Sequence, residues 1–491
     1  MTNAVLLVIF SLVGLSRSCL DPASAYRFTG TVCRLTYPAA AVLNEKTTEV
    51  IQAAFQHAKY PSIQGGKSLP LIGKVEYGLH NLEIHNLSIG KSDFELREND
   101  GIGIDISNVS ATFKGTVKYG YGSWLLRVGQ SVDFEIESQI DLVINSKLYC
   151  GKGRVAADTS DCYLTFHKLK LFLQGDREPG WLKRLFTEFI TFTVKLVVKG
   201  QICKEINTVA NILADFIQET AENFLSDGDI GVDISVTSAP VITSSYIESY
   251  HKGLAHYHDT KAHINESVFN PAQLTQDRML YFWISDELME PLMTAANADG
   301  RFVRNISGSE LKDLFKTELS NPMPEVVSKL LVSDGTVLRT WSSSVPSLRT
   351  TPEGTTVGAN AAVELTSTDP DIPSLSFDAD VKVIVRASYA EKKLILKAKP
   401  VQISILKAFQ DAVQLGDTEV TYLTEAVEKI GIPVVISYLE PALTDLMDEQ
   451  GLNLFDIINP EVLPRDGYVV IQMDFGFPHH LLVEFLKRTL E

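Results

Sequence analysis

The chain has 491 residues, of which 45% are hydrophobic and 21% charged, and its formal net charge is -17. This length exceeds one ordinary hydrophobic core, so we expect two or three domains. The acidic balance argues against nucleic acid or an anionic membrane surface as the main partner, because both attract basic proteins. It leaves room for local basic patches.

The chain opens with an apolar run, Ala4 to Leu15, that is too short to span a bilayer. Ser16 and Ser18 are small residues at the −3 and −1 positions of a cut before Cys19. We therefore expect residues 1–18 to be a signal peptide, the alternative being a buried terminal strand. No later segment has the length and apolarity of a membrane span, so the sequence predicts a secreted protein without stable membrane insertion.

Secretion makes two further features meaningful. N-glycosylation sequons begin at Asn86, Asn108, Asn265 and Asn305, and we expect some of them to be occupied. The five cysteines are Cys19, Cys33, Cys150, Cys162 and Cys203. In an oxidising compartment this odd number predicts one disulfide together with free or buried thiols.

After Cys33, apolar residues at helical spacing predict a helix over 38–56. Strand signals dominate from 71 to 148 and again over 163–173. A second, long helix is expected over 182–224, with Gly200 bending or interrupting it. A short strand at 232–236 follows, and the polar, His-rich stretch 251–270 indicates a connector.

Two stretches, 131–145 and 375–389, alternate between apolar and polar residues over most of their length. Alternate side chains point to opposite faces of a strand, so each stretch predicts an unusually long strand with one apolar face. The first apolar phase is Val132, Phe134, Ile136, Ile140, Leu142 and Ile144. The second is Leu375, Phe377, Ala379, Val381, Val383, Val385, Ala387 and Tyr389.

Strands and helices are predicted again in the second half of the chain, after the connector. A strand is expected at 279–284, a helix at 285–296, another helix at 419–430 with a further one after Pro433, and a strand at 468–475. Residues 328–370 are rich in Ser and Thr and predict loops and edge strands. The long strand and early helix recur in each half about 245 residues apart, which we interpret as a divergent duplication.

The last segment differs from the rest. After Gly476-Phe-Pro478, a short amphipathic helix is predicted over 479–491. Its apolar face is Leu481, Leu482, Phe485 and Leu486. So short a helix needs an apolar surface to dock on, and the alternative is that it only covers its own domain.

Enzyme signatures are missing: there is no Gly-x-Ser-x-Gly, His-Glu-x-x-His or Cys-x-x-Cys. Histidines at 251, 256, 258 and 263 could bind a metal, but His residues in a polar connector usually face solvent, so we expect no metal and no cofactor. The apolar strand faces could pack on each other, or they could enclose a volume that shelters lipid. From the residues alone, these two alternatives stay open.

Several segments resemble the bactericidal/permeability-increasing and lipopolysaccharide-binding protein superfamily. They are Cys33–Thr36, Asp161–Lys168, Leu173–Trp181, Lys199–Asn207, Ser226–Ser235, Leu454–Pro460 and Gln472–Pro478. The resemblance implies an α+β fold: an elongated boomerang of two helix-wrapped antiparallel β-barrels joined by a central β-sheet, plus the C-terminal amphipathic helix. We expect a signal peptide at 1–18, barrel domains at 19–250 and 271–475 around a linker at 251–270, and the helix at 476–491.

The resemblance also implies a function, which is lipid transfer rather than catalysis. The expected cargo is cholesteryl ester, triglyceride and phospholipid held in a hydrophobic tunnel. The expected partners are high-density, low-density and very-low-density lipoprotein particles in plasma, between which cholesteryl ester is exchanged for triglyceride. The alternatives are a phospholipid-transfer relative, a lipopolysaccharide-binding relative and a lipid hydrolase. The net charge and the terminal helix disfavour lipopolysaccharide binding.

The family's functional positions map onto particular residues. Its disulfide maps onto Cys162 and Cys203, and its lipid contacts map onto Leu35, Gln218, Ser249 and His251, where a hydroxyl and an imidazole could meet a phospholipid headgroup. The terminal residues Leu481, Leu482, Phe485 and Leu486 would flank a tunnel opening and assist transfer of neutral lipid.

Overall fold

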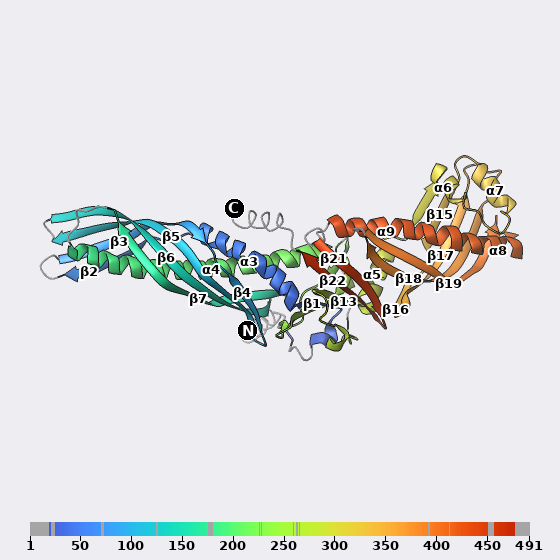
Figure 1. The fold of residues 1–491 in the computed structure, drawn as a ribbon. Coiled ribbons are helices and arrows are strands. Elements are labelled where there is room, and N and C mark those ends of the chain that lie inside the picture. Colours follow the sequence, from blue (N-terminus) through green and yellow to red (C-terminus); the bar gives the residue numbers. More distant parts are fainter. Residues whose placement is uncertain are drawn as a thin grey trace, which may run out of the picture. The chain divides into compact units, whose positions relative to one another are not determined.

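The computed structural model describes residues 19–20, 25–69, 73–123, 126–174, 180–224, 226, 228–258, 260–261, 264, 266–390, 393–411, 413–449 and 456–476. Within them the backbone divides into two compact units (Figure 1). Unit 1 combines 19–34, 218–238 and 248–476, and unit 2 combines 35–217 and 239–247. The predicted signal peptide and the predicted helix beyond Gly476 lie outside the described residues.

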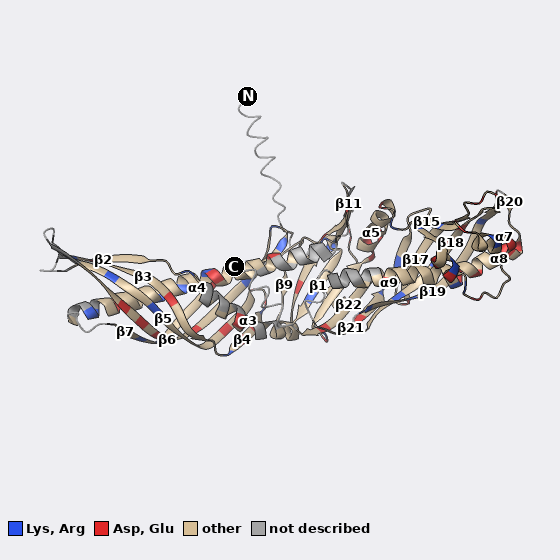
Figure 2. Ribbon diagram, turned by 90° about the horizontal axis from the view of Figure 1, so that it is seen from above, with Lys and Arg blue, Asp and Glu red and all other residues tan. Residues whose placement is uncertain are grey.

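Unit 2 is built on a six-stranded antiparallel sheet of order β2-β3-β5-β6-β7, with β4 paired to β5. Its strands are β2 (Ile63–Leu69), β3 (Gly73–Ser88), β4 (Ser92–Arg97), β5 (Gly101–Ser123), β6 (Leu126–Gly151) and β7 (Arg154–Leu173). The two-residue strand β9 (Val241–Ile242) also belongs to this unit. Charges of both signs are spread along β3, β5, β6 and β7 (Figure 2), so these strands keep a polar face.

The long alternating strand at 131–145 is confirmed as part of β6. Its whole apolar phase is buried, from Val132 to Ile144, while Asp133, Glu137 and Gln139 on the other phase are exposed. The buried phase joins Phe186, Ile190 and other helix residues in one continuous hydrophobic cluster. In this unit the apolar faces therefore pack against each other.

Two helices cover the sheet of unit 2. They are α3 (Tyr37–His57), as predicted, and α4 (Gly180–Phe224), whose residues from Gln218 onward belong to unit 1. Figures 1 and 2 both show α4 running lengthwise along the sheet. The predicted interruption at Gly200 was wrong, because α4 is one continuous helix of 45 residues. Val198 and Ile202, buried on either side of Gly200, hold the helix on the sheet through this point.

Unit 1 contains a seven-stranded antiparallel sheet of order β14-β15-β17-β18-β19-β20, with β16 paired to β17. Its strands are β14 (Arg304–Ser307), β15 (Val337–Ser342), β16 (Ser347–Thr351), β17 (Gly354–Thr366), β18 (Leu375–Ala390), β19 (Lys393–Gln410) and β20 (Val413–Gln414). The predicted strand at 375–389 is confirmed as β18. The prediction of loops and edge strands was wrong for part of 328–370, because β17 lies inside the sheet between β15 and β18.

Helices accompany this sheet. They are α6 (Gly308–Leu314), α7 (Glu325–Val332), α8 (Asp417–Ala426) and α9 (Ile432–Glu449), the last two joined by a π-helical turn, Val427–Gly431. Each unit thus has a meander of long strands followed by a long helix: β5-β6-β7 with α4, and β17-β18-β19 with α8 and α9. This recurrence agrees with the duplication inferred from the sequence.

A second sheet of unit 1 contains β21 (Asp456–Arg465), β22 (Tyr468–Gly476), β13 (Leu280–Ser285), β1 (Thr31–Thr36) and β10 (Tyr246–His251) in that order. The unit boundary crosses β1 after Arg34 and β10 before Glu248. Helix α5 (Asp286–Ala298) follows β13, and the Ser285 side chain caps it by accepting a hydrogen bond from the Glu287 N–H. Both elements were predicted.

A small sheet of order β12-β11-β8 completes unit 1. Its strands are β8 (Ile230–Asp233), β11 (Leu254–Tyr257) and β12 (Thr260–Lys261), and two short 3-10 turns lie at Tyr26–Phe28 and Pro271–Gln273. The structure differs from the sequence prediction here, because β11 and β12 lie inside the expected connector 251–270. Backbone pairing of β11 with β8 gives order to a stretch whose side chains show no periodicity. The α+β class is confirmed.

Candidate functional site

The apolar phase of β18 is buried at one end and half-buried over the rest of its length. Leu375 and Ala379 are buried, with half-buried Phe377 between them, and Leu375 belongs to a cluster with Leu330 and Tyr422. Beyond Ala379 the same phase is half-buried throughout, at Val381, Val383, Val385, Ala387 and Tyr389. The same sequence pattern therefore gives a packed core in unit 2 and a partly accessible apolar strip in unit 1.

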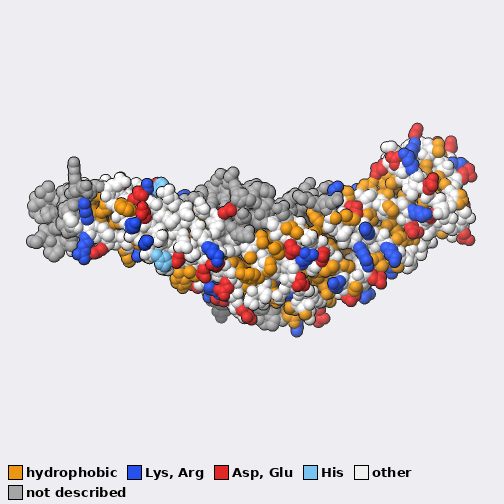
Figure 3. Space-filling view, in the orientation of Figure 1, with side chains coloured by type: hydrophobic (Ala, Val, Ile, Leu, Met, Phe, Trp, Pro, Cys, Tyr) orange, Lys and Arg blue, Asp and Glu red, His pale blue; other side chains and the backbone are white. Residues whose placement is uncertain are grey.

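Helix α9 lies along β19, next to this strip, and is attached by polar contacts (Figure 1). The Leu394 N–H donates to Oγ1 of Thr444 at 3.1 Å, and the Leu396 N–H donates to Oε1 of Glu440 at 2.5 Å. Apolar side chains of α9 stay accessible, with Val435 55% exposed. Figure 3 shows apolar side chains at the surface of unit 1 among charged ones. Accessible apolar area of this kind is stabilised by covering it with another apolar group, such as an acyl chain.

The second sheet of unit 1 has one buried layer that is polar and aromatic. Arg34 and Glu248 form an ion pair with Nη2 and Oε2 2.5 Å apart, and both are almost completely buried. The Arg34 Nη1 donates to the Leu274 carbonyl at 2.7 Å, and the Tyr250 hydroxyl donates to Oε1 of Glu248 at 2.8 Å. The rings of Tyr250 and Trp283 both contact Phe269, so these side chains lie on one face. The sequence analysis missed this network, although its signal was a charged residue on the buried phase of β1.

The opposite face of the same sheet is half-buried. Because side chains alternate along a strand, this face carries Cys33 of β1, Leu280 and Phe282 of β13, and Ser249 and His251 of β10. Burial, reinforced by the charge of Glu248, raises the pKa of the Cys33 thiol to about 12. The thiol is therefore protonated at neutral pH, and this makes it a poor nucleophile.

Ser249 and His251, both predicted as lipid contacts, are brought together. The Ser249 Oγ lies 2.8 Å from Nε2 of His251, and Nδ1 of His251 lies 2.8 Å from the Ile234 carbonyl oxygen. A carbonyl only accepts, so Nδ1 carries the proton and donates to Ile234, while Nε2 accepts from the Ser249 hydroxyl. Burial lowers the pKa of His251, which keeps the ring neutral and this arrangement intact at neutral pH.

The other predicted lipid contacts are in β1, in α4 and beyond Gly476. Leu35 is half-buried in β1 on the same phase as Cys33, and it belongs to unit 2. Gln218 is half-buried in α4, where that helix enters unit 1. The C-terminal contacts Leu481, Leu482, Phe485 and Leu486 lie outside the described residues.

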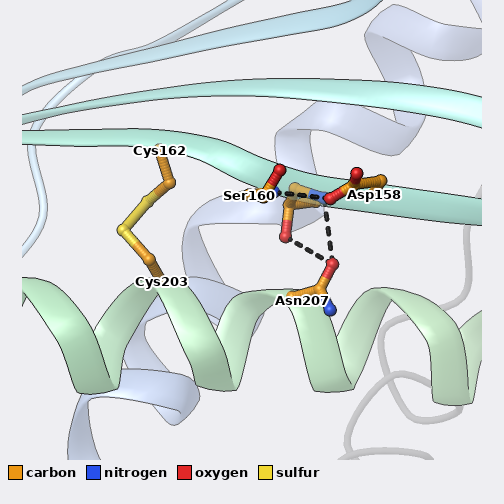
Figure 4. Close-up of a disulfide and its surroundings, with 6 residues drawn as sticks. Asp158, Ser160, Cys162, Cys203 and Asn207 are labelled. Atoms are coloured by element: carbon orange, nitrogen blue, oxygen red, sulfur yellow. Dashed lines mark hydrogen bonds between the residues drawn. A yellow bond between two sulfur atoms is a disulfide. The ribbon is translucent and has the colours of Figure 1, made fainter.

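The predicted disulfide is present. Cys162 of β7 and Cys203 of α4 are bonded, with Cα atoms 5.8 Å apart (Figure 4). One turn further along the helix, the Asn207 Oδ1 accepts from the Thr159 N–H at 2.9 Å. Cys19 and Cys150 are disulfide-bonded as well, and Cys33 is a free thiol. The expectation of a single disulfide was therefore too low.

Three predicted sequons are accessible. Asn86, Asn108 and Asn305 are exposed, and the first two adopt positive φ angles of 48° and 58°. Both lie at irregularities in the pairing of β5, with β3 and β6 respectively. A bulge that leaves a residue unpaired can turn its side chain outward. Asn265 lies outside the described residues.

In the described part of the chain, no three His, Cys, Asp or Glu side chains are arranged to hold a metal ion. Among the described helices, none combines the length and apolarity needed to cross a membrane.

Comparisons with known proteins identify the family. The family model "LBP / BPI / CETP family, N-terminal domain" matches residues 41–217. Cholesteryl ester transfer protein of Macaca fascicularis is 47% identical, over 93% of this chain and 94% of its own. The proteins of that name from Gallus gallus and Homo sapiens are each 45% identical, over 98% and 99% of this chain and 97% and 99% of theirs.

These matches place the chain among lipid transfer proteins rather than enzymes. The chain belongs to the LBP / BPI / CETP family.

Proposed function

We propose that this protein is secreted into plasma and exchanges cholesteryl ester and triglyceride, and also phospholipid, between high-density and triglyceride-rich lipoproteins. The cargo would travel in a hydrophobic tunnel, with no other cofactor. Relatives named cholesteryl ester transfer protein, at 45–47% identity, support this choice of cargo. Low-density and very-low-density particles are further expected partners.

The observation that carries the proposal is the half-buried apolar strip of β18, from Val381 to Tyr389. At about 3.3 Å per residue this strip is roughly 26 Å long. One leaflet of a bilayer, which is one acyl chain deep, is only about 15 Å thick. Each methylene moved from water to an apolar surface lowers the free energy of the lipid by about 0.8 kcal/mol. A strip of this length would therefore bind a water-insoluble acyl chain along its whole length.

We assign polar roles to the neighbouring residues. Ser249 and neutral His251 would contact a phospholipid headgroup or ester at the end of the tunnel, with Gln218 and Leu35 as further lipid contacts. The C-terminal helix would cover an opening with Leu481, Leu482, Phe485 and Leu486. Exposed Asn86, Asn108 and Asn305, and also Asn265, would carry glycans.

The first experiment is extraction of the purified protein with organic solvent, followed by mass spectrometry. We expect cholesteryl ester, triglyceride and phospholipid. Recovery of lipopolysaccharide or of phospholipid alone would instead favour one of the relatives with that specificity. The net charge of -17 disfavours lipopolysaccharide, because its phosphates attract basic proteins.

The second experiment mixes the protein with donor particles containing labelled cholesteryl ester and with unlabelled acceptor particles. Intact labelled ester in the acceptor supports transfer. Free fatty acid appearing instead would indicate a hydrolase and would contradict the proposal.

A further inference from the structure

The outer face of α4 in unit 2 carries a continuous exposed stripe. Residues four apart, Phe192, Leu196, Gly200, Lys204 and Thr208, are all exposed, and this spacing makes each one a surface neighbour of the next, along a ridge that winds around the helix. Phe192 is 67% and Leu196 58% exposed. A single exposed apolar residue needs no explanation, but two large ones on successive turns of one helix form a patch.

Lysines flank this stripe on the side toward β7. Lys195 Nζ lies 6.0 Å from the ring centre of Phe166, and Lys199 Nζ lies 5.5 Å from that of Tyr163. Tyr163 is itself exposed. Such lysines keep their stems on apolar surface and their charge in water. The pattern of apolar residues bordered by lysines matches a helix that lies on a lipid surface.

The charge of this part of α4 is opposite to that of the whole protein. Between Lys183 and Lys204 the helix has five Lys or Arg residues and one acidic residue, Glu188, in a chain of net charge -17. Glu188 lies 3.5 Å from Arg184, which leaves Lys195, Lys199 and Lys204 in excess over the acidic side chains of this segment. A local basic face on an acidic protein indicates an anionic partner at this face.

A pocket of about 470 Å³ adjoins the stripe where α3 ends beside α4. It is lined by Lys59, Tyr60, Pro61, Gln201, Lys204 and Glu205. Within the described residues, neither Lys59 nor Lys204 has an ion-pair partner. Two ammonium groups against the single carboxylate of Glu205 leave one net positive charge, and the Gln201 amide adds hydrogen-bond donors. Two ammonium groups and an amide donor can together bind a phosphate group.

We propose that the stripe Phe192–Leu196–Gly200–Lys204, with Lys195 and Lys199, docks on the phospholipid surface of a lipid particle. Phe192 and Leu196 enter the acyl layer, the lysines meet phosphates, and the Lys59–Lys204 pocket holds one headgroup. A second copy of this chain is a poorer occupant, because a symmetric contact would bring the two sets of lysines together. This inference rests on the proposed function for the identity of the particle.

The test measures binding of the full-length protein to phosphatidylcholine vesicles with and without phosphatidylserine, at low and high salt. Gly200→Glu places a carboxylate in the middle of the stripe, and a Cβ at Gly200 meets no atom within 4 Å, so the fold tolerates it. We expect its affinity for phosphatidylserine vesicles to fall about fivefold, since each charge near such a surface changes affinity about fivefold. High salt should weaken wild-type binding.

Gly180→Glu is the matched control. It introduces the same side chain and charge into the same helix, and a Cβ there also meets no atom within 4 Å. Gly180 begins the helix, about 18 Å along its axis before Phe192, the first residue of the stripe. We expect binding within twofold of wild type. Equal binding by Gly200→Glu and wild type would overturn the proposal. So would a change in the sedimentation of the free protein with Gly200→Glu, which would identify the stripe as a contact between copies.

The pocket is tested separately with Lys59→Gln/Lys204→Gln. Weaker vesicle binding, with no measurable binding of soluble glycerophosphate by wild type, supports a headgroup site at a lipid surface. Unchanged vesicle binding, with glycerophosphate binding that is lost in the variant, would overturn the headgroup assignment and leave a site for free phosphate.

The transfer assay separates this inference from the proposed function. If wild type transfers lipid but Gly200→Glu changes neither transfer nor vesicle binding, the docking inference alone fails. If wild type binds vesicles through the stripe but moves no neutral lipid, the proposed function alone fails.

Discussion

Arg34 of β1 and Glu248 of β10 form an ion pair inside the buried layer of unit 1, with side chains that are 2% and 1% exposed. The pair is complete in its hydrogen bonding, because backbone carbonyls of Leu274 and Pro271 accept from the guanidinium and Tyr250 donates to the carboxylate. Removing one partner leaves the other charged, buried and unpaired, and this is the costly situation for an ion pair.

The first prediction concerns this pair. We expect Arg34→Met to lower the free energy of unfolding by about 3–5 kcal/mol, measured by urea titration, because the Glu248 carboxylate stays behind. Combining Arg34→Met with Glu248→Leu should cost less than the sum of the two single changes. Additive losses would show that the two side chains do not depend on each other.

The second prediction concerns pH. Burial lowers the pKa of His251 below its ordinary value near 6.5, so the unfolded chain binds the proton more readily than the folded one. The contribution of His251 is therefore complete above about pH 6.5 and is lost as the pH falls from there toward the folded pKa. We expect the melting temperature of wild type to drop more between pH 7.5 and 5 than that of His251→Gln. Parallel pH profiles would contradict this.

The third prediction contrasts the two long strands. Val383→Phe adds volume to the half-buried strip of β18, and we expect little loss of stability but less extractable neutral lipid. Ile136→Phe adds volume to the packed core of unit 2, where Ile136 is completely buried. We expect it to cost about 1–3 kcal/mol. Urea titration and lipid extraction check both, and an equal loss of stability in the two variants would mean that the β18 strip is packed as well.

The fourth prediction concerns the C-terminal segment. Deletion of 480–491 should reduce neutral-lipid transfer while the circular dichroism spectrum and the melting temperature stay close to those of wild type. The physical reason is that a short amphipathic helix contributes through its apolar face, and we propose that this face covers a tunnel opening. A matched control replaces only the polar residues Lys487 and Arg488 by Gln. Unchanged transfer after the deletion would rule out this role.

Much of the fold follows from local pattern. Period-two alternation located β6 and β18, and helical spacing located α3. The prediction was wrong where packing overrode a local preference: Gly200 does not break α4, because buried Val198 and Ile202 hold it on the sheet. The strand β17 was missed in a Ser- and Thr-rich stretch, because its place inside the sheet depends on pairing with β15 and β18.

In the candidate site, too, some features could be predicted from the sequence and others depend on tertiary contacts. Resemblance alone gave the Cys162–Cys203 disulfide and the pair Ser249 and His251. No sequence pattern showed that the His251 ring is held by the Ile234 carbonyl, because the two residues are 17 positions apart and meet only in the folded chain. The same holds for Arg34 and Glu248, which are 214 positions apart.

By itself, the sequence determined that two long strands have one apolar side each, because side-chain direction alternates with every residue of a strand. Only the tertiary structure decided what covers those sides. In unit 2 the apolar residues of α4 bury the phase of β6, whereas in unit 1 α9 is attached to β19 through Glu440 and Thr444 and the β18 strip stays half-buried. Burial depends on the distance and angle at which a helix lies, and those are set by contacts between residues far apart in the chain.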